Sequence, residues 1–282
     1  MRIFLLTFLA MLAFAANSVL GRLALTQTPT QAALIDPANY TLIRLISGAI
    51  VLGLLAGLKN GFNKTAFAGS NIISAFSLFL YAAAFSFSYV AIDTGLGALI
   101  LFACVQLTMM GWAIVQKYKF TLGEIFGSLV AFGALIWLVS PGVSAPDPIA
   151  AVLMAISGIA WGIYSIRGQK SASALSASAG NFLLTIPMTL ILIRPFDFNP
   201  MGIALAVTSG AITSGLGYAL WYSVLPKLTT SRAAISQLSV PVLAGIGGTF
   251  LLSENWTLRF TIASTLILGG IALAIISKRK IN

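Results

Sequence analysis

Apolar residues fill this chain in long stretches, which short polar segments separate. Ten stretches approach the roughly 20 residues that a helix needs to cross a bilayer core of about 30 Å. Membrane barrel strands would alternate polar and apolar residues, whereas residues 42–58 and 266–276 carry apolar side chains on all faces. We therefore predict an all-α membrane protein with ten transmembrane helices, over residues 3–25, 39–58, 69–91, 95–116, 121–140, 148–168, 176–194, 200–222, 230–252 and 257–277.

Composition supports the membrane assignment. Only 8% of residues are charged and 59% are hydrophobic, whereas about a quarter of a soluble domain is charged. The net charge of +10 comes from Lys and Arg in short loops and forms no basic stripe, so we expect no nucleic-acid partner. The chain has no histidine, and its one cysteine, Cys104, lies in an apolar stretch. We expect no disulfide, no metal and no cofactor.

A seam over residues 140–148, with three prolines, a glycine and an aspartate, divides the chain. Five predicted spans precede it and five follow it. Because each half then crosses the bilayer an odd number of times, the second half lies inverted relative to the first. We predict a first repeat over 1–140, a seam loop over 141–148 and a second repeat over 149–282, which together form one transport domain.

The sequence matches itself across the seam. An offset of 137 pairs Tyr81 with Tyr218 and Gly133 with Gly270, without a gap through three spans. An offset of 145 pairs the first span with the sixth, including Arg22 with Arg167. Since the first span has this interior counterpart, we expect it to be a retained helix and not a cleaved signal peptide.

Basic residues predict the orientation. With the N-terminus in the cytoplasm, twelve Lys and Arg residues lie inside and four outside, as the positive-inside rule requires. We predict that both termini are cytoplasmic and that the protein is integral to the bacterial inner membrane. The acidic residues at the predicted outer ends are Asp36, Asp93, Asp147, Asp197 and Glu254.

Inverted repeats of odd span number are typical of secondary transporters, whose substrate site lies near the midplane between the halves. The chain also resembles the drug/metabolite transporter superfamily, of the EamA type. The resemblance rests on the five-plus-five layout, the Ala-Asn-Ser-Val run at 16–19, and Pro241 followed by Gly248 and Glu254. In the first half Cys104 and Lys117 replace the corresponding Pro and Glu.

The resemblance implies an exporter of small neutral or zwitterionic metabolites, most of all amino acids, and it includes similarity to aromatic amino-acid exporters. Alternating access at a cavity between the halves is the implied mechanism. The alternatives are a channel-like facilitator or an exporter of lipophilic cations or drugs. A membrane-embedded enzyme is disfavoured, because paired acids and metal ligands are missing from mid-membrane positions. The expected partners are the small-molecule substrate and lipid, and the expected state is a monomer or weak homodimer.

Polar and aromatic residues deep in the spans are the candidate substrate contacts. An amide in hydrocarbon needs a partner, so the three amides either join helices or line a cavity. Aromatic side chains with a polar tip can stack on a substrate and also donate a hydrogen bond. The predicted substrate-binding residues are Asn17, Tyr81, Gln106, Trp161, Tyr164, Tyr218, Trp221 and Gln237. Tyr89, nearer a span end, is expected to belong to an interfacial belt.

Three further residues have two interpretations each. Pro241 removes a backbone donor in the middle of a span and is either a hinge or a passive kink. Arg22 and Arg44 lie within about two turns of the outer ends. Each either contacts a substrate carboxylate or pairs with Asp36 or Asp93.

Overall fold

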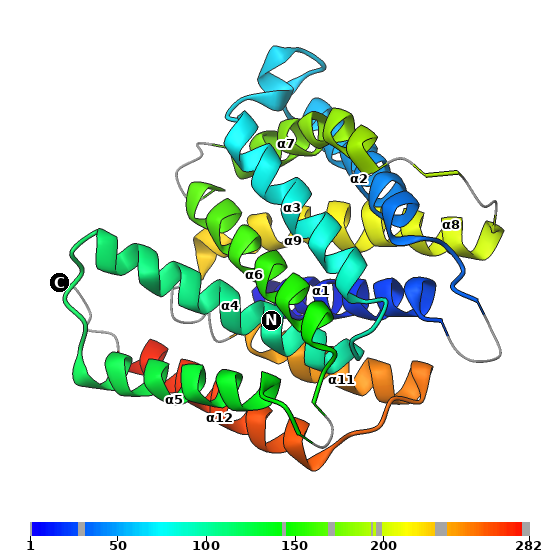
Figure 1. Cartoon of the computed structure of the whole chain (residues 1–282). Helices are drawn as coiled ribbons and strands as arrows, with labels where there is room; N and C mark the ends of the chain where they lie inside the picture. Colours follow the sequence, from blue (N-terminus) through cyan, green and yellow to red (C-terminus); the bar gives the residue numbers. More distant parts are fainter. Residues whose placement is uncertain are drawn as a thin grey trace.

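The computed structural model describes residues 2–27, 32–142, 145–168, 173–192, 194–195, 199–228 and 236–277. Its described elements are all helical (Figure 1). The first half of the chain contains α1 (Arg2–Leu25), α2 (Pro37–Asn60), the short 3₁₀-helix η1 (Lys64–Phe67), α3 (Ile72–Ser88), α4 (Thr94–Val115) and α5 (Leu122–Val139). The second contains α6 (Pro148–Gly168), α7 (Ala174–Thr189), η2 (Leu190–Leu192), α8 (Pro200–Thr208), η3 (Ser209–Leu216), α9 (Gly217–Val224), η4 (Leu225–Lys227), α11 (Ser239–Leu252) and α12 (Leu258–Ile276).

The apolar stretches predicted these helices to within a few residues, except in one span. Eight described helices are long and apolar enough to cross a membrane, when α7 and η2 are taken as one continuous helix and α8, η3 and α9 as another. The predicted spans 69–91 and 230–252 correspond to the shorter apolar helices α3 and α11. The predicted span 230–252 differs more from the structure than 69–91 does, because α11 begins only at Ser239 and residues 229–235 lie outside the described part. The ten-span count therefore stays a prediction.

Local signals explain where the helices begin. The carboxylate of Asp36 caps α2 by accepting hydrogen bonds from the backbone N–H groups of Ala38 and Asn39. At the start of α5, Thr121 and Glu124 form a capping box, in which each side chain accepts from the other residue's N–H. Two acids that the sequence places at span ends therefore have structural partners.

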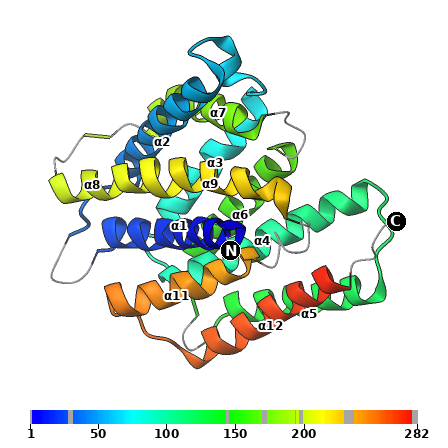
Figure 2. The same ribbon diagram turned by 180° about the vertical axis from the view of Figure 1, so that it is seen from behind.

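The helices form a layered bundle in which residues far apart in sequence lie side by side (Figures 1 and 2). At one edge α5 packs on α12, and at the opposite edge α2 packs on α7, while α1, α3 and α6 lie between them. Gly127 and Gly270 allow the α5–α12 contact, because each approaches the other's backbone carbonyl so closely that a Cβ atom would collide. The Gly123–Gly127 spacing is thus explained by helix packing.

Helix ends that the sequence predicts on the same side of the membrane lie together in the structure. At the predicted outer side, Arg22 at the end of α1 reaches Glu254 in the α11–α12 loop. At the predicted inner side, Arg167 at the end of α6 donates to Asn71 before α3. The contacts agree with a chain that alternates direction from span to span.

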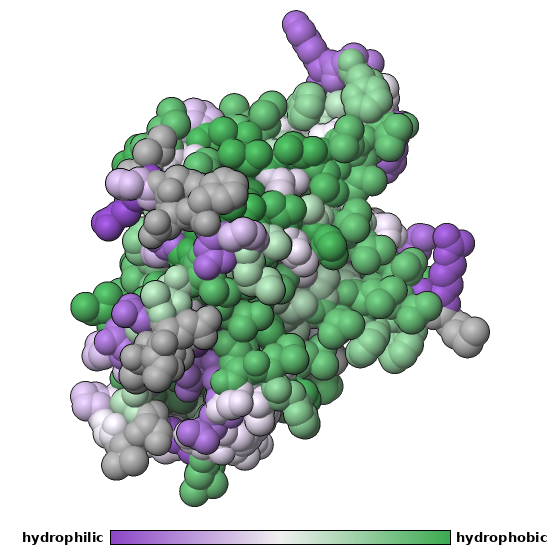
Figure 3. All heavy atoms as spheres, turned by 90° about the vertical axis from the view of Figure 1, so that its right-hand side faces the viewer, coloured by the Kyte–Doolittle hydropathy of each residue, from purple (hydrophilic) through white to green (hydrophobic). Residues whose placement is uncertain are grey.

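Apolar side chains cover a broad continuous area of the surface, and hydrophilic residues gather at its margins (Figure 3). On α5, for example, Leu122, Phe126 and Leu129 are all more than half exposed. Such exposure is costly in water and favourable in hydrocarbon. The surface therefore identifies an integral membrane protein.

Candidate functional site

Four of the predicted aromatic residues form one cluster at the centre of the bundle. Trp161 on α6 contacts the other rings of the cluster. The centroid of the Trp161 ring lies 4.9 Å from that of Tyr81 on α3 and 5.1 Å from that of Tyr218 on α9. Tyr164, one turn along α6, stacks on Trp161 at 5.4 Å. We call these four residues the aromatic cluster. It joins side chains from both halves of the chain.

The aromatic cluster borders a small enclosed space that we call the central cavity. Its volume is about 30 Å³, which is room for about one water molecule. The cavity residues come from six elements, namely α1, α3, α4, α6, η3 and α9. They are Phe14, Asn17, Ser18, Tyr81, Phe85, Leu101, Phe102, Trp161, Thr213, Ser214 and Tyr218. Four of the eight predicted substrate-binding residues thus line one cavity, and a substrate requires it to widen.

Asn17 is buried and bonded to the second half of the chain. Its Oδ1 accepts a hydrogen bond from the Ser209 hydroxyl at 2.7 Å and lies 3.1 Å from the Thr213 hydroxyl. Both hydroxyls belong to η3, a π-helical segment between α8 and α9. π-Helical turns are rare and occur often at functional sites. The amide joins the two halves and lines the central cavity, whereas its contact with substrate stays a prediction.

Arg44 lies deeper in the bundle than the sequence predicted. It lies 1% exposed inside the bundle, where its Nη2 donates to the Tyr81 hydroxyl at 2.9 Å and its Nε to Ser214 Oγ at 3.4 Å. Its guanidinium also lies over the rings of Phe85 and Tyr81, at 4.6 and 5.2 Å from the centroids. The proposed pairing of Arg44 with Asp36 or Asp93 is wrong, because these contacts direct the side chain inward.

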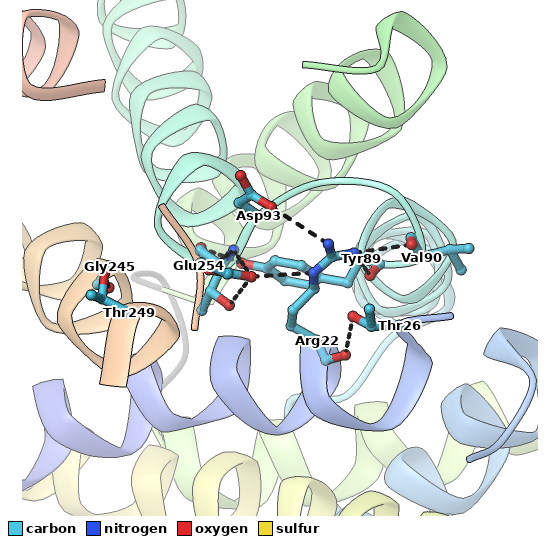
Figure 4. Close-up of polar contacts among 9 residues, drawn as sticks. Arg22, Thr26, Tyr89, Val90, Asp93, Gly245, Thr249 and Glu254 are labelled. Carbon is cyan, nitrogen blue, oxygen red and sulfur yellow. Dashed lines mark hydrogen bonds and ion pairs between the residues drawn. The ribbon is translucent and has the colours of Figure 1, made fainter. Parts of the chain in front are cut away.

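Arg22, at the end of α1, instead pairs with Asp93, one of its two predicted partners, and also with Glu254, which was not predicted as a partner (Figure 4). Its Nε donates to Glu254 Oε1 at 3.2 Å, and its Nη2 lies 3.5 Å from Asp93 Oδ1. Thr94 completes the contact, because its N–H and hydroxyl donate to the same Glu254 carboxylate at 2.9 and 3.0 Å. We call these four residues the Arg22–Glu254 cluster. It ties α1, the start of α4 and the α11–α12 loop together.

Tyr89 corrects one expectation. It was predicted to belong to the interfacial belt, yet its side chain is fully buried. Its hydroxyl donates to the Thr94 carbonyl at 3.1 Å, and its carbonyl accepts from Arg22. Its position near a helix end suggested exposure, but the Arg22–Glu254 cluster covers it.

The other predicted residues lie outside the central cavity. Tyr164 is buried beside it, with its hydroxyl 3.1 Å from Ser178 Oγ on α7, and Trp221 packs edge-on to Phe14 at 6.2 Å. Gln106 lines a separate cavity of about 380 Å³ between α4, α5 and α12. Gln237 lies just before α11 and is not among the described lining of either cavity. Its role as a substrate contact stays a prediction.

Pro241 is the third residue of α11. No extended segment precedes this helix, because Ser236 and Gln237 are also helical and Leu238, which joins them to α11, has α-helical dihedral angles. Both interpretations of Pro241, a hinge and a passive kink, therefore stay predictions.

Sequence reasoning missed the η3 segment. Ser209, Thr213 and Ser214 supply the hydroxyls that meet Asn17 and Arg44. The signal was a run of Ser, Thr and Gly over residues 208–215 inside an otherwise apolar span. Small polar residues at such a depth are typical of close helix contacts.

Comparison with known proteins decides the family. Residues 148–276 match the model of the EamA-like transporter family. An uncharacterized protein of Pseudomonas aeruginosa is 44% identical over 276 residues, which cover 96% of this chain and 94% of the relative. The chain belongs to the EamA-like transporter family.

More distant relatives include proteins described as transporters. An uncharacterized transporter of Archaeoglobus fulgidus is 23% identical over 285 residues, 95% of this chain and 96% of its own length. The uncharacterized transporter YoaV of Bacillus subtilis is 22% identical and covers 88% of this chain and 90% of its own. A solved structure titled "Crystal structure of protein" superposes with a TM-score of 0.67 at 18% identity, over 99% of each chain. This last likeness shows the fold alone.

The EamA family confirms the predicted superfamily of drug/metabolite transporters. It also supports transport rather than catalysis, with a small-molecule substrate and a lipid environment. In the part of the chain that the structure describes, no group of three or more potential metal-ligating side chains comes together.

Proposed function

We propose that this EamA protein is a secondary transporter that exports small neutral or zwitterionic metabolites, most of all amino acids, including aromatic ones. The substrate occupies the central cavity, and rocking of one five-helix repeat against the other opens it to each side in turn. The observation that carries the proposal is the central cavity itself, where aromatic rings and an amide from both halves meet at the centre of the bundle.

Ten spans in two inverted repeats have support in the helix contacts. If the sixth to tenth spans repeat the first to fifth, each pair of packed helices has a counterpart. The contact between α3 and α6 corresponds to the contact of α1 with the helix made of α8, η3 and α9. The contact between α4 and α6 corresponds to that between α1 and α11. Both members of each correspondence are in contact. Three further contacts join a helix to its own counterpart in the other half, namely α2–α7, α4–α11 and α5–α12. This is the pattern that a two-fold axis between the halves produces.

Two features support alternating access. The central cavity has room for about one water molecule, so binding an amino acid requires the halves to separate. The Arg22–Glu254 cluster ties three elements at one end of the bundle, and the positive-inside rule predicts that this end faces the outer side of the membrane. We infer that it closes the outer side and that its ion pair breaks when that side opens.

Efflux from proteoliposomes tests the proposal. Vesicles loaded with a panel of radiolabelled amino acids are expected to release a subset, aromatic ones included, in a saturable manner. Empty vesicles and vesicles carrying Trp161→Ala serve as controls. Release of no amino acid by well-reconstituted protein contradicts the proposed substrate class, and release that does not saturate favours a channel-like facilitator.

A further inference from the structure

Arg44 lies directly behind the wall of the central cavity. It contacts Tyr81, Phe85 and Ser214, and each of these three residues lines the cavity. The side chain itself is almost completely buried. A guanidinium keeps its proton at all accessible pH values, so a full positive charge sits beside the cavity.

This charge lacks a compensating partner. Among the described residues Arg44 makes no ion pair, and its Nη1 has no hydrogen-bond acceptor. The described carboxylates have other partners. Asp36 caps α2, Glu124 caps α5, Asp147 accepts from Ala150 N–H, and Asp93 and Glu254 meet Arg22. A buried charge without a counter-ion is strongly unfavourable, and a bound anion removes that cost.

The nearby polar groups also present donors. The Tyr81 hydroxyl accepts from Arg44, so its own hydrogen is free to point elsewhere. Asn17 uses Oδ1 toward η3, and its Nδ2 has no hydrogen-bond partner in the described part of the chain. Both residues line the cavity, and no described carboxylate does. The wall that contains Tyr81 and Asn17 therefore presents donors to an oxyanion, whereas no described carboxylate lines the cavity to pair with an ammonium group.

We propose that the central cavity binds organic carboxylates, whose carboxylate group pairs with Arg44 while an apolar or aromatic body lies against Trp161 and Tyr218. The inference rests on the proposed function and names the substrate group that the cavity recognises, because it makes the carboxylate essential and the α-ammonium group dispensable. Widening of the cavity, which any substrate requires, moves Tyr81, Phe85 and Ser214 aside and exposes the guanidinium. Arginine suits this role because its planar fork matches a carboxylate.

Four ligands of one shape separate the two charges. L-Phenylalanine carries both groups, 3-phenylpropionate only the carboxylate, phenylalaninamide only the ammonium, and 3-phenylpropionamide neither. Equilibrium binding to the purified full-length protein in nanodiscs, followed by tryptophan fluorescence, is expected to detect phenylalanine and 3-phenylpropionate with dissociation constants within about fivefold of each other. The two amides are expected to bind at least tenfold more weakly, since each tenfold is 1.4 kcal/mol of binding free energy.

Variants then assign the effect to Arg44. Arg44→Gln is expected to weaken both carboxylates at least tenfold and to leave the two amides unchanged. Tyr81→Phe, which keeps the charge, is expected to weaken the carboxylates less than Arg44→Gln does. Arg167→Gln removes an arginine at the far end of the bundle and is the matched control, with wild-type binding expected. Thermal unfolding without ligand reports whether each variant is folded.

The outcomes separate this inference from the proposed function. If phenylalaninamide binds as tightly as phenylalanine, or if folded Arg44→Gln binds the carboxylates like wild type, the Arg44 proposal is wrong while amino-acid transport stands. Binding of none of the four ligands also contradicts it. Should the wild type bind both carboxylates but release no amino acid in the efflux assay, the proposed export fails and the carboxylate site stands.

Discussion

Trp161 is the residue that holds the aromatic cluster together, because it contacts rings on α3, α6 and α9. We expect Trp161→Ala and Tyr218→Ala to weaken substrate binding by about five- to thirtyfold, which corresponds to about 1 to 2 kcal/mol for a lost stacking partner. Phe126→Ala, on the exposed face of α5, is the control. The apparent half-saturation constant for efflux is the measurement, and wild-type constants in both cavity variants would remove these rings from the site.

We expect Glu254 to make efflux depend on pH, with a sign that follows from the burial of its carboxylate. Burial raises the pKa of Glu254, although the Thr94 hydrogen bonds and the charge of Arg22 act to lower it. An exposed Glu has a pKa of about 4.3, so between that value and the raised one the closed Arg22–Glu254 cluster holds a proton that an open one releases. Acidification in this window therefore stabilises the closed form, and this stabilisation is lost as pH rises through the raised pKa.

We expect efflux to accelerate as the outer pH rises through this window and Glu254→Gln to abolish that dependence. Asp147→Asn, which alters a carboxylate in the seam that caps α6, controls for general charge effects. Initial rates from vesicles of fixed internal pH are the readout. An unchanged pH profile in Glu254→Gln would assign the titration to another group.

At the scale of the helix, η3 decides how α2 fits against the second half. Gly210 approaches the Arg44 carbonyl and the Ser47 hydroxyl so closely that an added Cβ atom would collide with both. We predict that Gly210→Ala destabilises the protein by about 1 to 3 kcal/mol, the usual cost of overpacking. Gly133→Ala, where nothing lies within 4 Å of the new atom, is the matched control. Thermal unfolding in detergent measures both, and equal midpoints would mean that the α2–η3 contact is looser than described.

Most helices could be predicted from the sequence, because a bilayer demands about 20 apolar residues and the polar loops mark the ends. The predicted 148–168 is α6 to the residue. The π-helical turn could not be predicted, since a shift to i→i+5 bonding leaves the apolar pattern unchanged. The direction of Arg44 could not be predicted either. It depends on the rotation of α2 about its axis, which tertiary packing decides.

The candidate site could likewise be predicted only in part. Asn17, Tyr81, Trp161 and Tyr218 were predictable as polar or aromatic residues deep in repeat-related spans, and they share one cavity. Gln106 met the same criteria and lines another cavity, because its face of α4 turns toward α5 and α12. Depth in the membrane can be estimated from sequence, whereas the face of a uniformly apolar helix cannot.

For the whole molecule, the predicted inverted repeat can be tested with a pair of loops. Lys117 before α5 and Glu254 before α12 correspond at the offset of 137, so inverted repeats place these loops on opposite sides of the membrane. In a Cys104→Ser background, we expect an impermeant maleimide added outside intact cells to label Asn255→Cys and not Lys119→Cys. Permeabilised cells supply the control for reactivity. Labelling of both, or of neither, from outside would refute the inverted topology.

We propose that substrate crosses the membrane by alternating access at the cavity between the halves. The most direct measurement is counterflow of radiolabelled phenylalanine in proteoliposomes preloaded with unlabelled phenylalanine. Alternating access predicts transient accumulation of label above its equilibrium level, saturable with external substrate and strongly reduced in Trp161→Ala. Label that only equilibrates, at the same rate with and without internal substrate, would contradict the account and indicate a channel.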